Sequence, residues 1–169
     1  MSQIAHLDML LPSMANYLNQ HLKTQKRDEI LMVGIHTGGV WVAERLHQLL
    51  NLPQPLGQLN IAFYRDDFSR IGFHPRVKPS ALPIEVDNRH IILVDDVLHT
   101  GRTIRAALNE IFDYGRPASV TLAVLIERNG RELPIQPDII GCSLCLESGK
   151  TVKLCGPEPL SLEIRTVHE

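Results

Sequence analysis

The sequence predicts an α/β protein with a mostly parallel, twisted sheet and helices on both of its faces. Apolar stretches of the length and composition of buried strands recur along the chain, at residues 29–35, 56–64, 91–94 and 119–126. Segments with helical spacing separate several of them, at residues 40–50 and 104–112. Strands that alternate with helices form parallel sheets, because each helix carries the chain back across the sheet before the next strand.

The composition bounds the size of the protein and its environment. With 169 residues, 44% of them apolar, we expect one domain over residues 1–169 that buries a substantial core. A net charge of −2 gives no general attraction to nucleic acid or to anionic lipid. The sequence has no apolar run of membrane-spanning length and no secretion signal, so we expect a cytoplasmic protein without membrane contact.

The first expected element is a helix over residues 4–22, where apolar residues recur every three or four positions. Pro12 would break a helix interior, so we place it in the first turn, with Asp8 as the N-cap. Residues 23–28 are polar and end this helix. A short loop rich in small residues then follows the strand at residues 29–35, and a second ligand-facing loop is expected there.

Residues 65–83 form a polar insert without clean periodicity, which follows the expected strand at residues 56–64. A polar insert of this length in a compact domain is uncommon unless it is functional or mobile. The end of the chain alternates short strands with turns, at residues 139–146, 151–155 and 160–167.

Three cysteines occur late in the chain, and an odd number does not indicate a disulfide framework. Cys142 and Cys145 have the spacing of a metal site but lack a second pair. The residues between them alternate as in a strand, so we expect small buried side chains instead.

The most informative stretch begins with the buried strand at residues 91–94. Asp95 and Asp96 follow it, then a turn containing Thr100 and Gly101, and then a helix. The free amides at a helix start bind phosphate, whereas ionised carboxylates only accept hydrogen bonds and so suit hydroxyl groups. A sugar phosphate meets both demands, with its diol on the carboxylates and its phosphate in the loop.

This stretch resembles the phosphoribosyl diphosphate (PRPP) binding motif of type I phosphoribosyltransferases. Two further stretches, Tyr-Arg-Asp-Asp at residues 64–67 and Arg-Glu-Leu-Pro-Ile at residues 131–135, resemble the narrower PyrR family of pyrimidine-operon attenuators that are also uracil phosphoribosyltransferases. The resemblance covers about residues 29–141. It implies the type I phosphoribosyltransferase fold with a small hood, formed here by the insert at residues 65–83.

The resemblance also implies the reaction and its partners. Uracil and PRPP would give UMP and pyrophosphate, with Mg²⁺ on the diphosphate and no direct protein ligand to the metal. Family members assemble as homo-oligomers, dimers or larger, and some bind RNA through a basic first helix. Here residues 4–22 contain no Lys or Arg, so the electrostatic attraction to RNA is weak.

Site residues follow from the matching positions. The catalytic candidates are Asp95, Asp96 and Arg65. The remaining candidates are Leu98, His99, Thr100, Gly101, Arg102 and Thr103 for the 5′-phosphate, His36, Thr37, Gly38 and Gly39 for the pyrophosphate, Tyr64, Asp66 and Asp67 in the hood, and Ile126, Glu127 and Arg128 beside the base, with Arg131 and Glu132 behind them.

Two loops depart from the family pattern. Basic residues usually flank the threonine of the pyrophosphate loop, but this chain has His36 and Gly38 there, and His99 replaces an aromatic residue. Positive charge for the pyrophosphate would then come from Mg²⁺, from the insert or from protonated His36. The alternatives are a UMP-gated RNA-binding attenuator, a phosphoribosyltransferase for another base, and a weakly catalytic nucleotide sensor.

Overall fold

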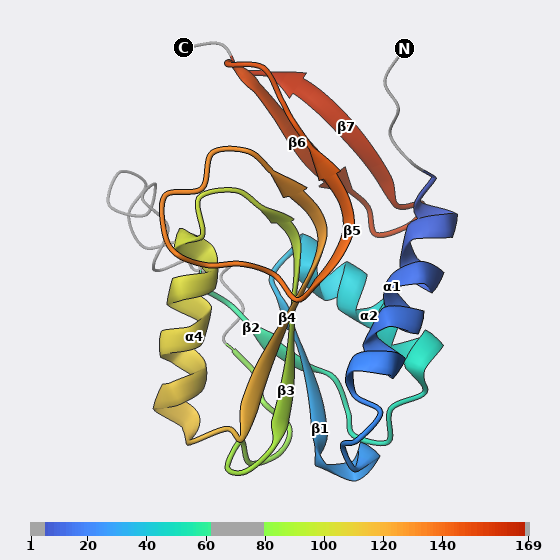
Figure 1. Ribbon diagram of the computed structural model, residues 1–169, viewed down its shortest axis with the longest axis vertical. Helices are drawn as coiled ribbons and strands as arrows, with labels where there is room; N and C mark the ends of the chain where they lie inside the picture. The colour runs from blue at the N-terminus through green and yellow to red at the C-terminus, as the bar shows by residue number, and fades with distance from the viewer. Residues whose placement is uncertain (1–5, 62–79, 168–169) are drawn as a thin grey trace.

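The protein is built on a parallel sheet with the strand order β2-β1-β3-β4-β5 (Figure 1). A computed structural model describes residues 6–61 and 80–167. The strands of this sheet are β1 (Ile30–Ile35), β2 (Gly57–Leu59), β3 (His90–Leu98), β4 (Ser119–Arg128) and β5 (Ile139–Leu144). Every neighbouring pair in it is parallel, which confirms the predicted fold class.

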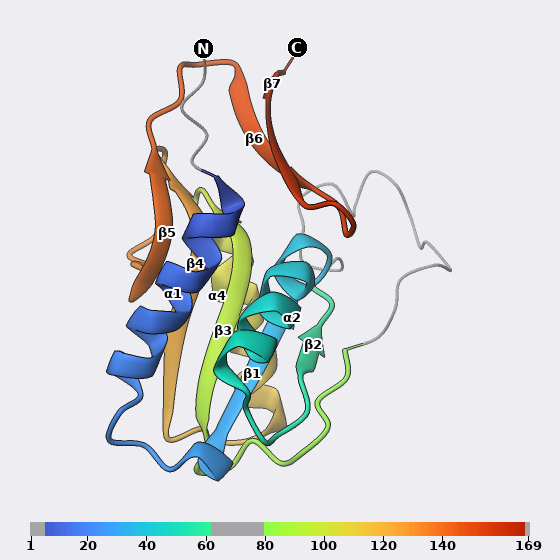
Figure 2. The same cartoon turned by 90° about the vertical axis from the view of Figure 1, so that its right-hand side faces the viewer.

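Helices cover both faces of the sheet, also as predicted (Figures 1 and 2). One face carries α1 (Leu7–His21) and α2 (Gly38–Leu50), and the other carries α4 (Arg102–Tyr114). A 3-10 turn at Arg27–Glu29 leads into β1. Alternate residues of β3 belong to the two cores: Ile92 and Val94 pack with α1 and α2, whereas Ile91 and Leu93 pack with α4. The central strand therefore has no solvent-facing side over this stretch.

The start of α1 differs from the prediction. The helix begins at Leu7 with His6 as its N-cap, so Asp8 lies inside the first turn and Pro12 lies beyond it. Proline is tolerated there because Pro12 is on the exposed side of the helix. Asp8, whose carbonyl loses its usual amide partner to the proline, is also an exposed residue.

The strand predicted over residues 56–64 is shorter, since β2 ends at Leu59. Gln58 of β2 also pairs with Ala81 in an isolated antiparallel bridge, with both N···O distances 2.8 Å. This bridge fixes the point where the chain returns from the insert. Tyr64, Arg65, Asp66 and Asp67, which carry the hood prediction, lie outside the described residues.

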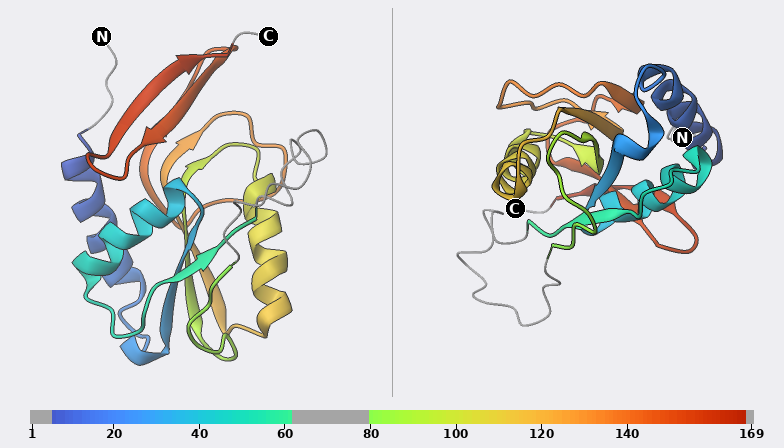
Figure 3. Two further views of the ribbon diagram at one scale, coloured as in Figure 1. Left: turned by 180° about the vertical axis from the view of Figure 1, so that it is seen from behind. Right: turned by 90° about the horizontal axis from the view of Figure 1, so that it is seen from below.

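The end of the chain forms a separate antiparallel hairpin of β6 (Lys150–Cys155) and β7 (Ser161–Thr166) (Figures 1 and 3). Val152 and Leu154 of β6 pack into the core beneath α1 and α2. The parallel sheet ends at β5, because β6 pairs with β7 and not with β5.

The expectation that the cysteines are buried is wrong. Cys145 is exposed just past the end of β5, while Cys142 and Cys155 are half-buried, and all three are free thiols. They lie on an edge strand and in a hairpin, where one side of the backbone faces solvent. Within residues 6–61 and 80–167, no group of three or more His, Cys, Asp or Glu side chains could hold a metal ion. The same residues include no helix long and apolar enough to cross a membrane.

Candidate functional site

The acidic pair lies within β3 and not after it, because the strand runs on to Leu98. Asp95 is only 5% exposed and Asp96 is half-buried. Oδ1 of each carboxylate accepts a hydrogen bond of 2.9 Å from the next backbone amide, from Asp96 N and from Val97 N. These bonds hold both carboxylates at the carboxyl end of the central strand, where ligands bind in open α/β sheets.

The candidate phosphate loop is a tight turn between β3 and α4. Leu98 is the last residue of the strand, and Arg102 and Thr103 already belong to the first turn of the helix, so only residues 99–101 form the turn. Gly101 has φ +94°, which favours glycine at this position. The first amides of α4 have no partner within the helix, and the helix dipole adds positive potential there. The turn therefore has the chemistry of an anion site.

Gly38 and Gly39 are the first residues of α2 and not part of the preceding loop, which leaves only His36 and Thr37 in the turn after β1. A Cβ on Gly39 would lie 2.7 Å from the carbonyl oxygen of Val94 in β3. The sequence could not reveal this early start, because it depends on how closely the helix approaches the neighbouring strand. The His36 ring nitrogen Nε2 lies 2.8 Å from Oε1 of Gln58 on β2.

The end of β4 supplies the residues predicted to lie beside the base. Ile126 is buried, whereas Glu127 and Arg128 are half-buried. Arg128 donates through Nη1 to Oγ1 of Thr151 at 3.3 Å, and its buried Nε has no hydrogen-bond partner. A hollow of about 270 Å³ opens here, lined by Glu127, Arg128, Asn129, Gly130, Arg131, Ser143 and Leu144.

The segment after β4 lies against the candidate phosphate loop. Arg131 donates through Nη1 to the carbonyl of His99 at 2.6 Å. The backbone amide of Glu132 donates to the carbonyl of Thr100, and the Glu132 carboxylate pairs with Nε of Arg102 at 2.8 Å. The sequence motif suggested a position behind the base, and these contacts with the phosphate loop were missed. No local pattern signals them, because they join two segments about thirty residues apart.

His99 is exposed on the turn, with its ring over Gly130. A Cβ on Gly130 would lie 2.6 Å from Nε2 of His99. Partial burial lowers the pKa of His99, and the positive charge of Arg128 lowers it further, while Glu132 opposes this effect. The imidazole is therefore biased toward its neutral form when no anion is bound.

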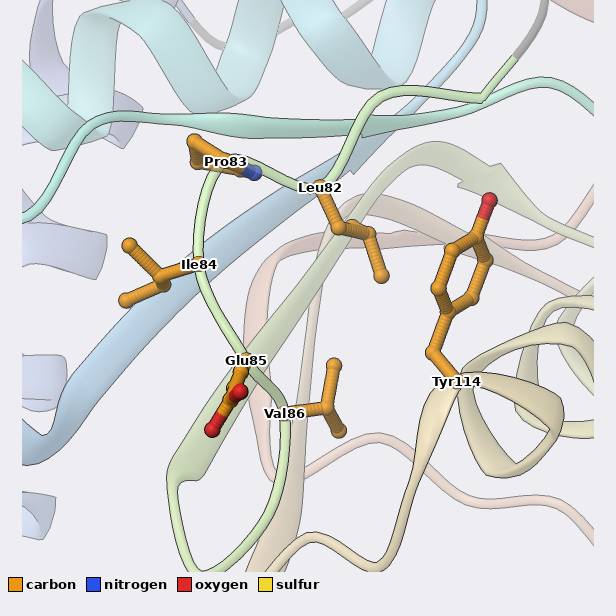
Figure 4. A pocket seen from close by; sticks show the side chains of 6 residues that line it. All are labelled: Leu82, Pro83, Ile84, Glu85, Val86 and Tyr114. Atoms are coloured by element: carbon orange, nitrogen blue, oxygen red, sulfur yellow. The ribbon is translucent and has the colours of Figure 1, made fainter.

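A second hollow, of about 370 Å³, is lined by Leu82, Pro83, Ile84, Glu85, Val86 and Tyr114 (Figure 4). Tyr114 is the last residue of α4, so this hollow lies at the opposite end of that helix from the phosphate loop. Its lining offers one carboxylate and one phenol among apolar side chains. Because it lies at the far end of α4, this second hollow is separate from the acidic pair.

An acidic pair followed by a tight turn at the start of a helix is the arrangement predicted for a protein that binds sugar phosphates. Residues 2–157 match the family model of the phosphoribosyl transferase domain, which makes the chain a phosphoribosyltransferase. Its curated relatives include Bifunctional protein PyrR of Nitrosococcus oceani, 63% identical over 164 residues that cover 96% of this chain and 93% of the relative. Bifunctional protein PyrR of Pseudomonas aeruginosa is 59% identical, with 91% of each chain covered. The chain belongs to the PyrR family.

Solved structures show the same fold at low sequence identity. A hypoxanthine-guanine phosphoribosyltransferase from Bacillus anthracis has a TM-score of 0.67 at 14% identity and covers 85% of this chain and 84% of its own. Hypoxanthine phosphoribosyltransferase from Trypanosoma cruzi has a TM-score of 0.65 at 19% identity, over 81% of this chain and 76% of its own. The parallel sheet is thus the phosphoribosyltransferase fold.

Proposed function

We propose that the protein transfers the phosphoribosyl group of PRPP to uracil, giving UMP and pyrophosphate, with one catalytic domain over residues 1–169. The observation that carries the proposal is the position of Asp95 and Asp96, which lie near the end of the central strand, a few residues before the turn at residues 99–101 that leads into α4. A ribose 5-phosphate presents a diol, which suits the carboxylates, and a phosphate, which suits the amides of the turn. Membership of the PyrR family supports uracil as the base.

In this proposal the carboxylates of Asp95 and Asp96 accept hydrogen bonds from the ribose hydroxyls, and residues 98–103 hold the 5′-phosphate. Residues 36–39 face the pyrophosphate, where the start of α2 adds amides and the positive end of its dipole. Ile126, Glu127 and Arg128 lie by the base. Arg65, Tyr64, Asp66 and Asp67 keep their sequence-based role in a hood over the site.

The reaction breaks the bond between C1 of the ribose and the pyrophosphate oxygen, and it forms the bond between C1 and N1 of uracil, whose proton is released. Positive charge develops on the ribose ring while a strongly negative group leaves. In this proposal the carboxylate pair stabilises that ring charge, and preorganised amides favour the departing anion. Cover by the insert would exclude water from the reactive ring.

Mg²⁺ is the proposed cofactor, bound to the diphosphate of PRPP. Oxygen donors suit this cation, and the diphosphate supplies them, so the metal needs no direct protein ligand. When bound, the metal would neutralise charge on the pyrophosphate. Asp95 and Asp96 would still orient the ribose, and residues 98–103 would still hold its phosphate.

Regulation through RNA is the second function to test, because the curated relatives are called bifunctional. Arginines at positions 102, 105, 128 and 131 lie around the phosphate loop and could contact RNA phosphates. In α1, by contrast, only His21 adds a basic group in the last turn. We propose a homo-oligomer in the cytoplasm, a reducing compartment in which the free thiols of the three cysteines persist.

The deciding experiment measures pyrophosphate release from PRPP and Mg²⁺ with uracil, hypoxanthine, xanthine or orotate. Turnover with uracil alone supports the proposal, and turnover with a purine in its place would assign another base. Absence of turnover with all four, while UMP still binds, would indicate a nucleotide sensor. A filter-binding assay with pyrimidine-operon leader RNA, with and without UMP, tests the regulatory function separately.

A further inference from the structure

The segment at residues 131–133 holds the phosphate loop from its outer side. Nη1 of Arg131 donates to the carbonyl of His99 at 2.6 Å. The backbone amides of Glu132 and Leu133 donate to the carbonyl of Thr100 at 3.0 and 3.1 Å. Two consecutive carbonyls of the turn are therefore fixed by donors from one neighbouring segment.

Fixing these carbonyls also fixes the direction of the amides that a phosphate needs. In a trans peptide the C=O and N–H groups point to opposite sides, and the peptide bonds of this turn are trans. The carbonyls of His99 and Thr100 point toward residues 131–133. The amides of Thr100 and Gly101 consequently point away from that segment, toward the side on which an anion would bind.

Arg131 is itself anchored to the sheet. Its Nη2 lies 2.6 Å from Oε1 of Glu127, and both side chains are about one-quarter exposed, at 23% and 24%. The other oxygen of Glu127 accepts from Oγ of Ser143 at 3.3 Å. Arg131 thus connects a carbonyl of the turn to a carboxylate near the end of β4, through two nitrogens of one planar guanidinium group.

We infer that Arg131 is a positioning residue for the 5′-phosphate: it holds the His99 carbonyl against the end of β4 and thereby keeps the Thr100 amide directed at the phosphate. The inference rests on the proposed function, since it concerns the same ligand. A lysine keeps the charge but not the planar fork, so it cannot hold Glu127 and His99 in this geometry at once. The role therefore depends on shape as well as on charge.

Calorimetric titration with UMP and ligand-observed NMR titration with uridine, which lacks the phosphate, test the inference. In Arg131→Gln and in Arg131→Lys we expect UMP affinity to fall about tenfold or more, and uridine affinity to stay within about twofold. Arg165→Gln is the matched control, because it removes an exposed arginine on β7 and should leave UMP affinity unchanged.

The outcomes distinguish a failure of the inference about Arg131 from a failure of the proposed function. Equal losses for UMP and uridine would mean that Arg131 supports the whole site, and full recovery in Arg131→Lys would mean that only its charge matters; either result overturns the inference. If Arg131→Gln does not fold, the Arg131→Lys variant decides. Failure of the wild type to bind UMP or PRPP overturns the proposed function itself and is seen before any variant is made.

Discussion

Gly38 and Asp96 meet so closely that a Cβ on Gly38 would lie 2.6 Å from Cγ of the Asp96 carboxyl group. The Asp96 carboxylate can lie against the start of α2 because residue 38 has no side chain. The position of the Asp96 carboxylate therefore depends on the glycine at residue 38.

Replacing Gly38 by alanine should displace the Asp96 carboxylate and weaken PRPP binding. We expect a loss of about tenfold, comparable to one impaired hydrogen bond to a charged group, with the melting temperature nearly unchanged. The displaced atoms belong to the end of a side chain, so the backbone need not shift. Calorimetry with PRPP and Mg²⁺ measures the effect. An alanine variant with wild-type affinity would show that the contact is irrelevant to the ligand.

Gly39→Ala provides the contrasting case, because the added Cβ would meet backbone. The nearest atom is the carbonyl oxygen of Val94 at 2.7 Å, in the middle of the sheet. We expect the free energy of unfolding to fall by about 1–3 kcal/mol, the usual cost of overpacking. Urea denaturation followed by circular dichroism checks this. A stability equal to that of Gly38→Ala would contradict the distinction between the two glycines.

A fixed charge at residue 36 should help the pyrophosphate. His36→Lys places an ammonium group in the turn before α2, and we expect PRPP to bind about tenfold more tightly, from about 1–3 kcal/mol of charge-assisted bonding. His36→Gln is the matched neutral variant and should give no gain. Michaelis constants for PRPP in both variants test the idea. If the lysine variant gains nothing, the pyrophosphate does not approach this turn.

Asp96→Asn should weaken the proposed contact with the ribose hydroxyls and leave the fold intact, since Asp96 is half-buried and the amide oxygen can still accept from Val97 N. A charged acceptor contributes about 1.5–3 kcal/mol per hydrogen bond, so PRPP affinity should fall about tenfold to a hundredfold. Unchanged affinity in a folded variant would rule out the ribose assignment. A crystal soaked with UMP gives the complementary view, with phosphate expected at residues 99–103.

The titration of His99 should depend on the ligand. Burial and Arg128 lower its pKa without ligand, so it stays neutral until the pH falls below its ordinary value of 6.5. A bound 5′-phosphate dianion favours the imidazolium, and UMP should therefore raise the pKa of His99. Histidine NMR titrations with and without UMP measure this, and His99→Gln identifies the resonance. A pKa that UMP leaves unchanged would place the phosphate away from the turn.

The same shift affects stability with a definite sign. A histidine whose pKa is lower in the folded state takes up protons more readily when unfolded, so the folded state loses stability as the pH falls below 6.5. His99→Gln should reduce that loss. Unfolding measured on both sides of this pH in the two proteins tests the sign, and equal pH dependence would indicate that His99 does not contribute.

The sequence alone determined the class of fold and the central motif. The buried run at residues 91–94, the acidic pair and the Gly-Thr turn are local patterns, because they reflect strand burial, backbone conformation and the chemistry of adjacent groups. The alternation of buried strands with helical segments predicted a parallel sheet with helices on both faces, and the observed strand order and helix placement agree with this.

Only the tertiary structure decided how distant segments complete the site. The contact of Gly38 with Asp96 and the hydrogen bond from Arg131 to His99 join residues far apart in the chain. Such contacts depend on the separation of packed elements to within an ångström, and side-chain patterns do not record that separation. The free thiols at the sheet edge were misjudged for the same reason, since burial depends on which strand lies last in the sheet.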